Sequence, residues 1–159
     1  MTTLARLLAL PCLVLAACVQ TSGGGGGTSS TTGALCDSDP RAMVYAAGLS
    51  ATSGDGKLKA SLAAAQPAPP EKGINTWTVQ LEDGSGNPVS GATVTITPWM
   101  PDHGHGSSIV PQVMPMASAG SYQVTLLDLF MPGIWQVTFD VTPASGPDEK
   151  VTFSFCIDG

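Results

Sequence analysis

Proline and glycine recur at short intervals along this chain, and they limit its fold more than any other feature. The sequence of 159 residues contains 13 prolines and 19 glycines. After residue 65, one of the two interrupts nearly every apolar run, which leaves little room for an amphipathic helix of ordinary length. Short strands joined by turns are the remaining solution, so the chain is expected to be all-β.

Between these breaks, apolar and polar residues alternate as they do in half-buried strands. In "NTWTVQLED", for example, Trp77, Val79 and Leu81 fall on one face. The pattern predicts about seven strands, at residues 43–51, 57–66, 75–83, 92–99, 121–129, 133–142 and 149–157. An immunoglobulin-like antiparallel β-sandwich buries one face of each strand, and it is the predicted fold.

Several local details follow from the same pattern. The turn "DGSGNPVSG" (83–91) predicts a hairpin between the strands on either side of it, and "LAAAQ" (62–66) allows a helical turn as the alternative to a strand. The side chains expected to point inward elsewhere are Leu58, Ala60, Leu62 and Ala64; Val94 and Ile96; Tyr122, Val124 and Leu126; Val137, Phe139 and Val141, with Ile134 or Trp135; and Val151, Phe153 and Phe155.

The N-terminal residues 1–17 have the features of a secretory signal. The apolar run after Arg6 contains Pro11 and is too short to span a bilayer as a helix. It ends in "LAAC", which resembles a bacterial lipobox and implies a lipid on Cys18; a plain signal peptide is the alternative. Residues 18–35 are rich in Gly, Ser and Thr and predict a flexible tether to one domain over residues 36–159. By resemblance to lipoprotein sorting signals, Val19 favours anchoring in the outer membrane.

Two cysteines, Cys36 and Cys156, remain once the signal and the lipid anchor account for Cys12 and Cys18. An even pair in an oxidising compartment predicts a disulfide. Metal binding by the two thiolates is the alternative, but they lack the close spacing of a typical cysteine metal motif.

The charge distribution argues against nucleic acid as a partner. Twelve acidic and six basic residues give a net charge of −6, and the basic residues are scattered. No serine or cysteine stands beside a histidine in a recognisable nucleophile motif, so the chain is not expected to be an enzyme.

Both histidines, His103 and His105, lie in one window of the chain, residues 100–131. Four of the five methionines other than Met1 lie there too: Met100, Met114, Met116 and Met131. Thioether sulfur prefers Cu(I) and imidazole suits copper and zinc, so these residues predict a copper site, with Cu(I) favoured and Cu(II) or Zn as alternatives. Core packing for the methionines and simple solvation for the histidines are the competing interpretations.

These residues also carry a family resemblance. "NTWTVQLEDGSGNPVSGATVTITPWMPDHGHGS" and "GSYQVTLLDLFMPGIWQVTFDV" resemble the YtkA-like domain of the FixH/YtkA type, over about residues 55–156. The matching positions are Gly73, Asn75, Trp77, Gly86, Pro88, Val89, Met100, Pro101, His103, His105, Gly120, Tyr122, Met131, Gly133 and Trp135. Asp102 departs from the pattern, because several relatives have a methionine there, and its harder oxygen leaves room for Cu(II) or Zn.

The resemblance implies an immunoglobulin-like extracytoplasmic protein with a part in copper handling or oxidase maturation. We therefore expect a lipid-anchored copper carrier or buffer that exchanges metal with a delivery partner. The alternative is a non-catalytic structural or adhesive surface module, because "DGSGNPVSGATV" also resembles repeat domains of bacterial surface proteins.

Overall fold

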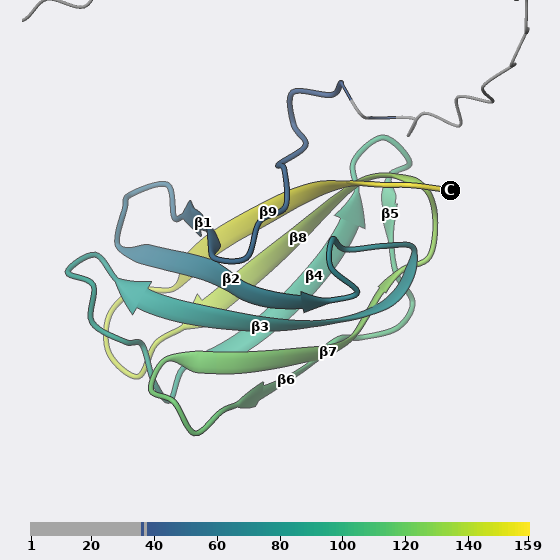
Figure 1. The fold of residues 1–159 in the computed structure, drawn as a ribbon. Helices are drawn as coiled ribbons and strands as arrows, with labels where there is room; N and C mark the ends of the chain where they lie inside the picture. Colours follow the sequence, from purple (N-terminus) through teal and green to yellow (C-terminus); the bar gives the residue numbers. More distant parts are fainter. Residues whose placement is uncertain (1–35, 37) are drawn as a thin grey trace, which may run out of the picture. The chain divides into compact units, whose positions relative to one another are not determined.

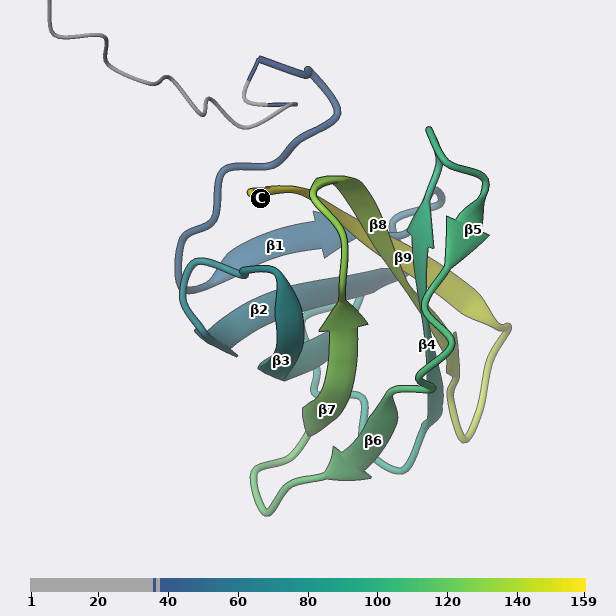
Figure 2. The same cartoon turned by 90° about the vertical axis from the view of Figure 1, so that its right-hand side faces the viewer.

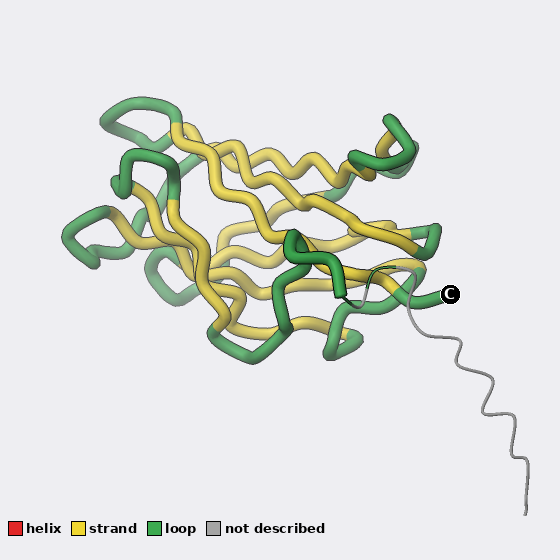
Figure 3. Tube along the Cα trace, turned by 90° about the horizontal axis from the view of Figure 1, so that it is seen from above, coloured by secondary structure: helices red, strands yellow, loops and turns green. Residues whose placement is uncertain are grey.

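The computed structural model describes residue 36 and residues 38–159. The predicted signal peptide (1–17), the tether (18–35) and the lipidated Cys18 lie outside the described residues. In the part that is described, no helix has the length and apolar character needed to cross a membrane, and Figure 3 shows only strands and loops there.

Two antiparallel sheets pack face to face (Figure 1). The first has the order β1-β2-β3-β7-β6 and the second the order β5-β4-β8-β9. The strands are β1 (Leu49–Thr52), β2 (Leu58–Gln66), β3 (Gly73–Asp83), β4 (Thr93–Met100), β5 (His105–Gly106), β6 (Gln112–Pro115), β7 (Ser121–Leu129), β8 (Gly133–Thr142) and β9 (Glu149–Ile157).

This strand order confirms the immunoglobulin-like prediction. Counted from β2, the sheets correspond to strands A-B-E-D and C′-C-F-G of an immunoglobulin domain, and β1 extends the first sheet at its edge. The two strands that the sequence analysis missed, β5 and β6, are only two and four residues long. Of the first predicted strand, 43–51, only the end from Leu49 onward is a strand.

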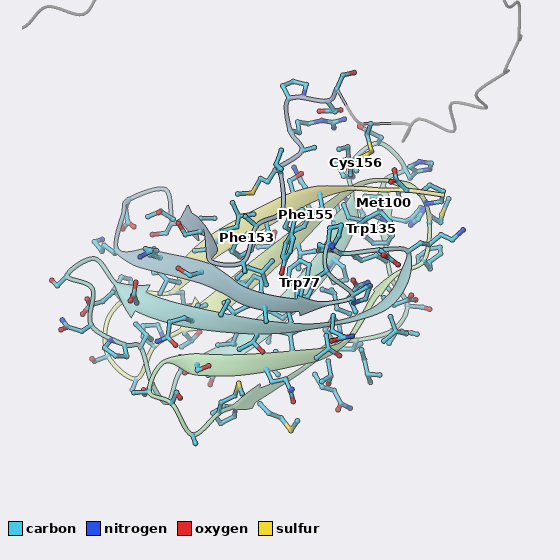
Figure 4. The ribbon with its side chains drawn as sticks, viewed as in Figure 1. Trp77, Met100, Trp135, Phe153, Phe155 and Cys156 are labelled. Carbon is cyan, nitrogen blue, oxygen red and sulfur yellow. A yellow bond between two sulfur atoms is a disulfide. The ribbon has the colours of Figure 1, made fainter. Side chains whose placement is uncertain are left out.

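The core between the sheets is centred on aromatic rings. Trp77 of β3 is fully buried, stacks on Phe139 of β8, and meets Phe153 and Phe155 of β9 edge to face, with centroid distances of 5.6–6.4 Å (Figure 4). Burying such a side chain contributes about 1.5–3 kcal/mol. These residues come from strands of both sheets, so the cluster holds the two layers together.

The predicted hairpin across residues 83–91 is wrong, because β3 and β4 belong to different sheets. The turn itself does form, since the Asp83 amide donates to the Asn87 carbonyl. Beyond it, the Tyr122 hydroxyl of β7 donates to the Val89 carbonyl and accepts from the Ala92 amide, each at 3.0 Å. The chain pairs with β3 only briefly, through the bridge between Glu82 and Pro88 and the hydrogen bond from the Val89 amide to the Leu81 carbonyl, and then crosses to the second sheet.

Two β-bulges change which side chains of β2 and β7 point into the core, compared with the prediction. The pairing of β2 with β3 shifts between Leu62 and Ala64, so Ala65 is buried and Ala64 is exposed. "LAAAQ" is therefore a bulged strand and not a helical turn. On β7, Leu126 has a φ of 56° and is 39% exposed, while Leu127 is buried in its place. Residues in the left-handed region interrupt the strict alternation on which such predictions rest.

The segment before β1 is attached to the end of β9. Cys36 and Cys156 form a disulfide with their Cα atoms 5.5 Å apart, as the sequence predicted. Further along, the Met43 amide donates to the Ser154 carbonyl at 2.7 Å. Cys36 and Met43 are thereby fixed near one end of the sandwich, the end at which β4 finishes and β8 begins.

Candidate metal centre

His103 lies on the tight turn between β4 and β5, and His105 is the first residue of β5. The amides of His103 and Gly104 both donate to the Met100 carbonyl, at 3.2 and 2.9 Å, and Gly104 adopts a φ of 69°. The chain then reverses so that His105 pairs with Met100. A glycine at the left-handed position makes this reversal possible without steric cost.

The imidazole rings of His103 and His105 lie beside each other in a tilted, edge-on arrangement, at a separation that allows them to share one ion. Their centroids are 5.7 Å apart, with an interplanar angle of 61°. An ion about 2.0 Å from a ligating nitrogen lies about 3.2 Å from the ring centroid, so two rings that share it have centroids about 5–6 Å apart. The observed separation fits that requirement.

The hydrogen bonding of His105 also suits a ligand. Its Nδ1 lies 3.3 Å from the Gly106 carbonyl oxygen. A proton on Nδ1 would be donated to this carbonyl, which leaves the lone pair of Nε2 free for a metal.

The turn between β7 and β8 forms the other wall of the site. The Phe130 ring stacks on His105 at 5.7 Å and meets Trp135 edge to face at 5.6 Å. The indole Nε1 of Trp135 donates to the Met131 carbonyl at 2.8 Å, which fixes the turn. One side of the histidine pair is thus shielded by aromatic rings.

Gly133 allows the two turns to approach each other. Its φ is 129°, and a Cβ at this position would lie 2.9 Å from Met100 Cε and 3.9 Å from His103 Nε2. A Cβ here would require the Met100 methyl group to shift, whereas it would only touch His103 at ordinary van der Waals distance. The positive φ, which side chains other than glycine rarely adopt, is the stronger reason for glycine at this position.

The structure divides the predicted methionines into two groups. Met131 directly follows Phe130 on the turn between β7 and β8, and its partly buried side chain packs against the core. Met100 is fully buried in the core cluster beneath the same turn, as Figure 4 shows near Trp135. Met100 and Met131 are thus the two predicted methionines at the same end of the sandwich as the histidines, and both side chains pack on the core.

Met114 and Met116 are not brought to the histidines, which corrects the predicted ligand set. Met116 lies beside Ser90 and Gly91, just before β4 begins, whereas the histidines follow its end. The eight residues of β4 span about 25 Å. Figure 2 shows the physical reason: the chain leaves β5, crosses to the other sheet and runs along β6 toward the opposite end.

Asp102, also on the histidine turn, is held by an arginine. Arg41 donates from Nη1 and Nη2 to the two carboxylate oxygens of Asp102, both at 2.7 Å, and from Nε and Nη2 to Asp39. The hydrogen bonds from Arg41 lower the pKa of Asp102 and bring the pKa of Asp39 to about 2. Both carboxylates are therefore charged and bound to the guanidinium at neutral pH.

The sequence analysis missed Arg41 and Asp39. The motif "DSDPR" places an acid two residues before the arginine, a local signal for their pairing. Asp102 is 61 residues away, however, and only the attachment of the N-terminal segment to β9 brings the two together.

The donor set fits a soft ion of low coordination number. The two imidazoles lie at the end of the sandwich that also carries Met100 and Met131, and no three His, Cys, Asp or Glu side chains within residues 36 and 38–159 gather so as to hold a metal. Tetrahedral zinc sites usually need three or four such ligands, whereas Cu(I) accepts nitrogen with thioether sulfur.

Fold and site together define an immunoglobulin-like sandwich domain with a histidine and methionine cluster at one end. The chain belongs to the YtkA-like family, whose model matches residues 55–140. This range contains both histidines, Met131 and Trp135, whereas Arg41 and the disulfide lie outside it. No curated protein and no solved structure matches the chain.

Proposed function

We propose that this protein is an extracytoplasmic, lipid-anchored copper-binding protein that carries or buffers Cu(I). The observation that supports it most is the 5.7 Å separation of two imidazole rings on a turn that a second, aromatic turn shields. His103 and His105 supply the nitrogens, and Met131 supplies the sulfur. Bound in this way, Cu(I) would be held by neutral ligands, as its softness favours.

The exposure of the histidines suits a carrier. His103 is exposed and His105 is half-buried, so the ligands of a partner protein can approach the ion from the solvent side. Release then requires only ligand exchange and no catalytic step. Such a role fits copper delivery in metal handling or oxidase maturation, and we propose no enzymatic activity.

The cellular location of the proposed function depends on the N-terminal sequence. "LAAC" would place a lipid on Cys18, and Val19 favours retention at the outer membrane. Replacing Cys18 with serine is expected to release the protein from membranes or to stall its processing, which fractionation and mass measurement detect. A variant that is cleaved normally and still partitions with membranes would contradict the anchor.

A metal titration of the full-length protein in mild detergent tests copper binding. Competition with a Cu(I) chelator is expected to give an affinity that falls at least about hundredfold in the variant His103→Ala/His105→Ala, because both nitrogen ligands are lost. Met131→Leu, which nearly conserves volume, should weaken Cu(I) binding by a smaller factor.

The matched control is Met114→Leu/Met116→Leu. These methionines are 50% and 44% exposed and lie at the other end of the sandwich, so the variant should bind Cu(I) as the wild type does. Equal affinity in the wild type and the double-histidine variant would reject the copper site and favour the structural surface module instead.

A further inference from the structure

We infer that Arg41 determines the metal specificity of this site by withholding the carboxylate of Asp102 from the ion. The inference rests on the proposed function. Asp102 is the only acidic residue on the turn between β4 and β5, and it precedes His103 directly. Arg41 comes from a different part of the chain, before β1, and reaches the turn across the end of the sandwich.

The geometry of the Arg41–Asp102 ion pair keeps the carboxylate bound to the guanidinium. Both oxygens of Asp102 accept a hydrogen bond from the guanidinium, one from Nη1 and one from Nη2, each at 2.7 Å. Planar, bidentate pairs of this kind are the strongest that arginine forms. A metal could recruit Asp102 only after this pair has separated.

The guanidinium of Arg41 is also held in place by a second carboxylate, that of Asp39. Asp39 accepts from Nε, from Nη2 and from the backbone amide of Arg41, at 2.6–3.2 Å. The same segment is attached to β9 by the disulfide and by the Met43 amide. The segment before β1 therefore directs Arg41 toward the turn between β4 and β5, and the position of Arg41 does not depend on Asp102.

The chemical consequence is a choice between two ligand sets. Two imidazoles with a carboxylate form the set that binds zinc in many proteins, and a hard oxygen also suits Cu(II). Two imidazoles with a thioether suit Cu(I). Because Arg41 binds the carboxylate, the set of two imidazoles and a thioether stays available to the ion. The set that includes the carboxylate is disfavoured.

The effect should be moderate, because the pair is accessible to water. The side chains of Arg41 and Asp102 are 40% and 51% exposed, and exposed ion pairs are weak individually. The bidentate geometry and the third charge on Asp39 strengthen this one. We expect the ratio of Zn(II) to Cu(I) affinity to rise about three- to tenfold when Arg41 loses its charge.

The experiment measures Zn(II) and Cu(I) affinities by chelator competition in the full-length protein and in four variants. Arg41→Gln should raise the ratio of Zn(II) to Cu(I) affinity. Arg41→Gln/Asp102→Asn should return it to the wild-type value, because the carboxylate is then absent. Arg41→Lys keeps the charge but cannot form the bidentate pair, so its ratio of Zn(II) to Cu(I) affinity should lie between those of the wild type and Arg41→Gln. It replaces Arg41→Gln if that variant fails to fold. Lys57→Gln makes the same charge change at the opposite end, where Lys57 pairs with Asp55, and should leave the ratio unchanged.

Three results overturn the inference. One is an unchanged ratio in Arg41→Gln. Another is an increase that persists when Asp102→Asn is added to Arg41→Gln, which would reflect loss of positive charge alone. The third is an equal increase in Lys57→Gln. Failure of the proposed function is distinguishable, because the wild-type protein would then show no histidine-dependent Cu(I) binding at all.

Discussion

At the scale of single residues, Gly133 controls how closely the two turns of the site can approach. Its φ of 129° strains any other residue, and a Cβ would lie 2.9 Å from Met100 Cε. Gly133→Ala is therefore expected to lower the free energy of unfolding by about 1–3 kcal/mol, as measured by urea denaturation.

Gly104→Ala is the matched control for this prediction. Gly104 also has a positive φ, 69°, but a Cβ there would meet no atom within 4 Å. Its alanine variant should lose only about 1 kcal/mol, from backbone strain alone. Equal losses in the two variants would mean that neither the φ of 129° nor the contact with Met100 adds to the cost at Gly133.

Single residues also show how far the sequence could predict the site. The i, i+2 spacing of His103 and His105 predicts that their side chains lie close together, and their ring centroids are 5.7 Å apart. Met114 and Met116 share that spacing, yet they lie at the other end because β6 runs away from the turn. Met100 and Met131, whose spacing from the histidines is less regular, are the ones at the same end of the sandwich. A short separation in the sequence does not reveal in which direction the chain runs between two residues.

At the scale of elements, strand positions were predictable because alternation is a local property, whereas the connection after β3 was not. The turn at residues 83–87 has the composition of a hairpin, but Tyr122, a residue of β7, directs the chain to the second sheet. Bulges were missed for a related reason, since the register shifts between Leu62 and Ala64 and between Asn75 and Trp77 depend on the partner strand.

This contact can be tested through the Tyr122 hydroxyl. Tyr122→Phe leaves the Val89 carbonyl and the Ala92 amide without their partner, so the free energy of unfolding should fall by about 1–3 kcal/mol in urea. Tyr45→Phe is the control, because Tyr45 packs on Phe155 and its hydroxyl forms no hydrogen bond with the residues that the structure describes. A Tyr122 variant as stable as the Tyr45 variant would contradict this account.

The turn after β3 should also make stability depend on pH. A hydrogen bond from the side chain of Asn87 lowers the pKa of Asp83 below its ordinary value of 3.8, and a hydrogen bond from the backbone amide of Asn87 has a smaller effect in the same direction. A carboxyl whose folded pKa is lowered stabilises the protein above its unfolded pKa, and this stability is lost as the pH falls through the folded pKa. Between pH 5 and pH 2, Asp83→Asn should therefore lose less stability than the wild type does. Parallel pH profiles of the unfolding free energy would exclude a contribution from Asp83.

At the scale of the whole molecule, the disulfide connects the stability of the fold to the proposed specificity of the metal site. Cys36 and Cys156 are separated by 120 residues, and closing a loop of this length reduces the entropy of the unfolded chain. The same bond fixes the segment that carries Arg41, and this segment lies outside the matched family range. The sequence indicated the disulfide by the number of cysteines, but it gave no sign that the bond would direct an arginine to the histidine turn.

Cys36→Ala/Cys156→Ala is expected to change both properties. Its free energy of unfolding should fall by up to about 4 kcal/mol, because the unfolded chain regains its freedom. In the variant that remains folded, the segment that carries Arg41 loses its covalent attachment to β9 but keeps the backbone hydrogen bond from Met43 to Ser154 and the packing of Met43 on the core. Arg41 should then engage Asp102 for less of the time, and the ratio of Zn(II) to Cu(I) affinity should rise as it does in Arg41→Gln, but by a smaller factor. Chelator competition below the unfolding transition measures this ratio, and adding Asp102→Asn to the cysteine variant should remove the increase. A destabilised protein with the wild-type ratio would show that Asp39 alone is enough to hold the arginine in place.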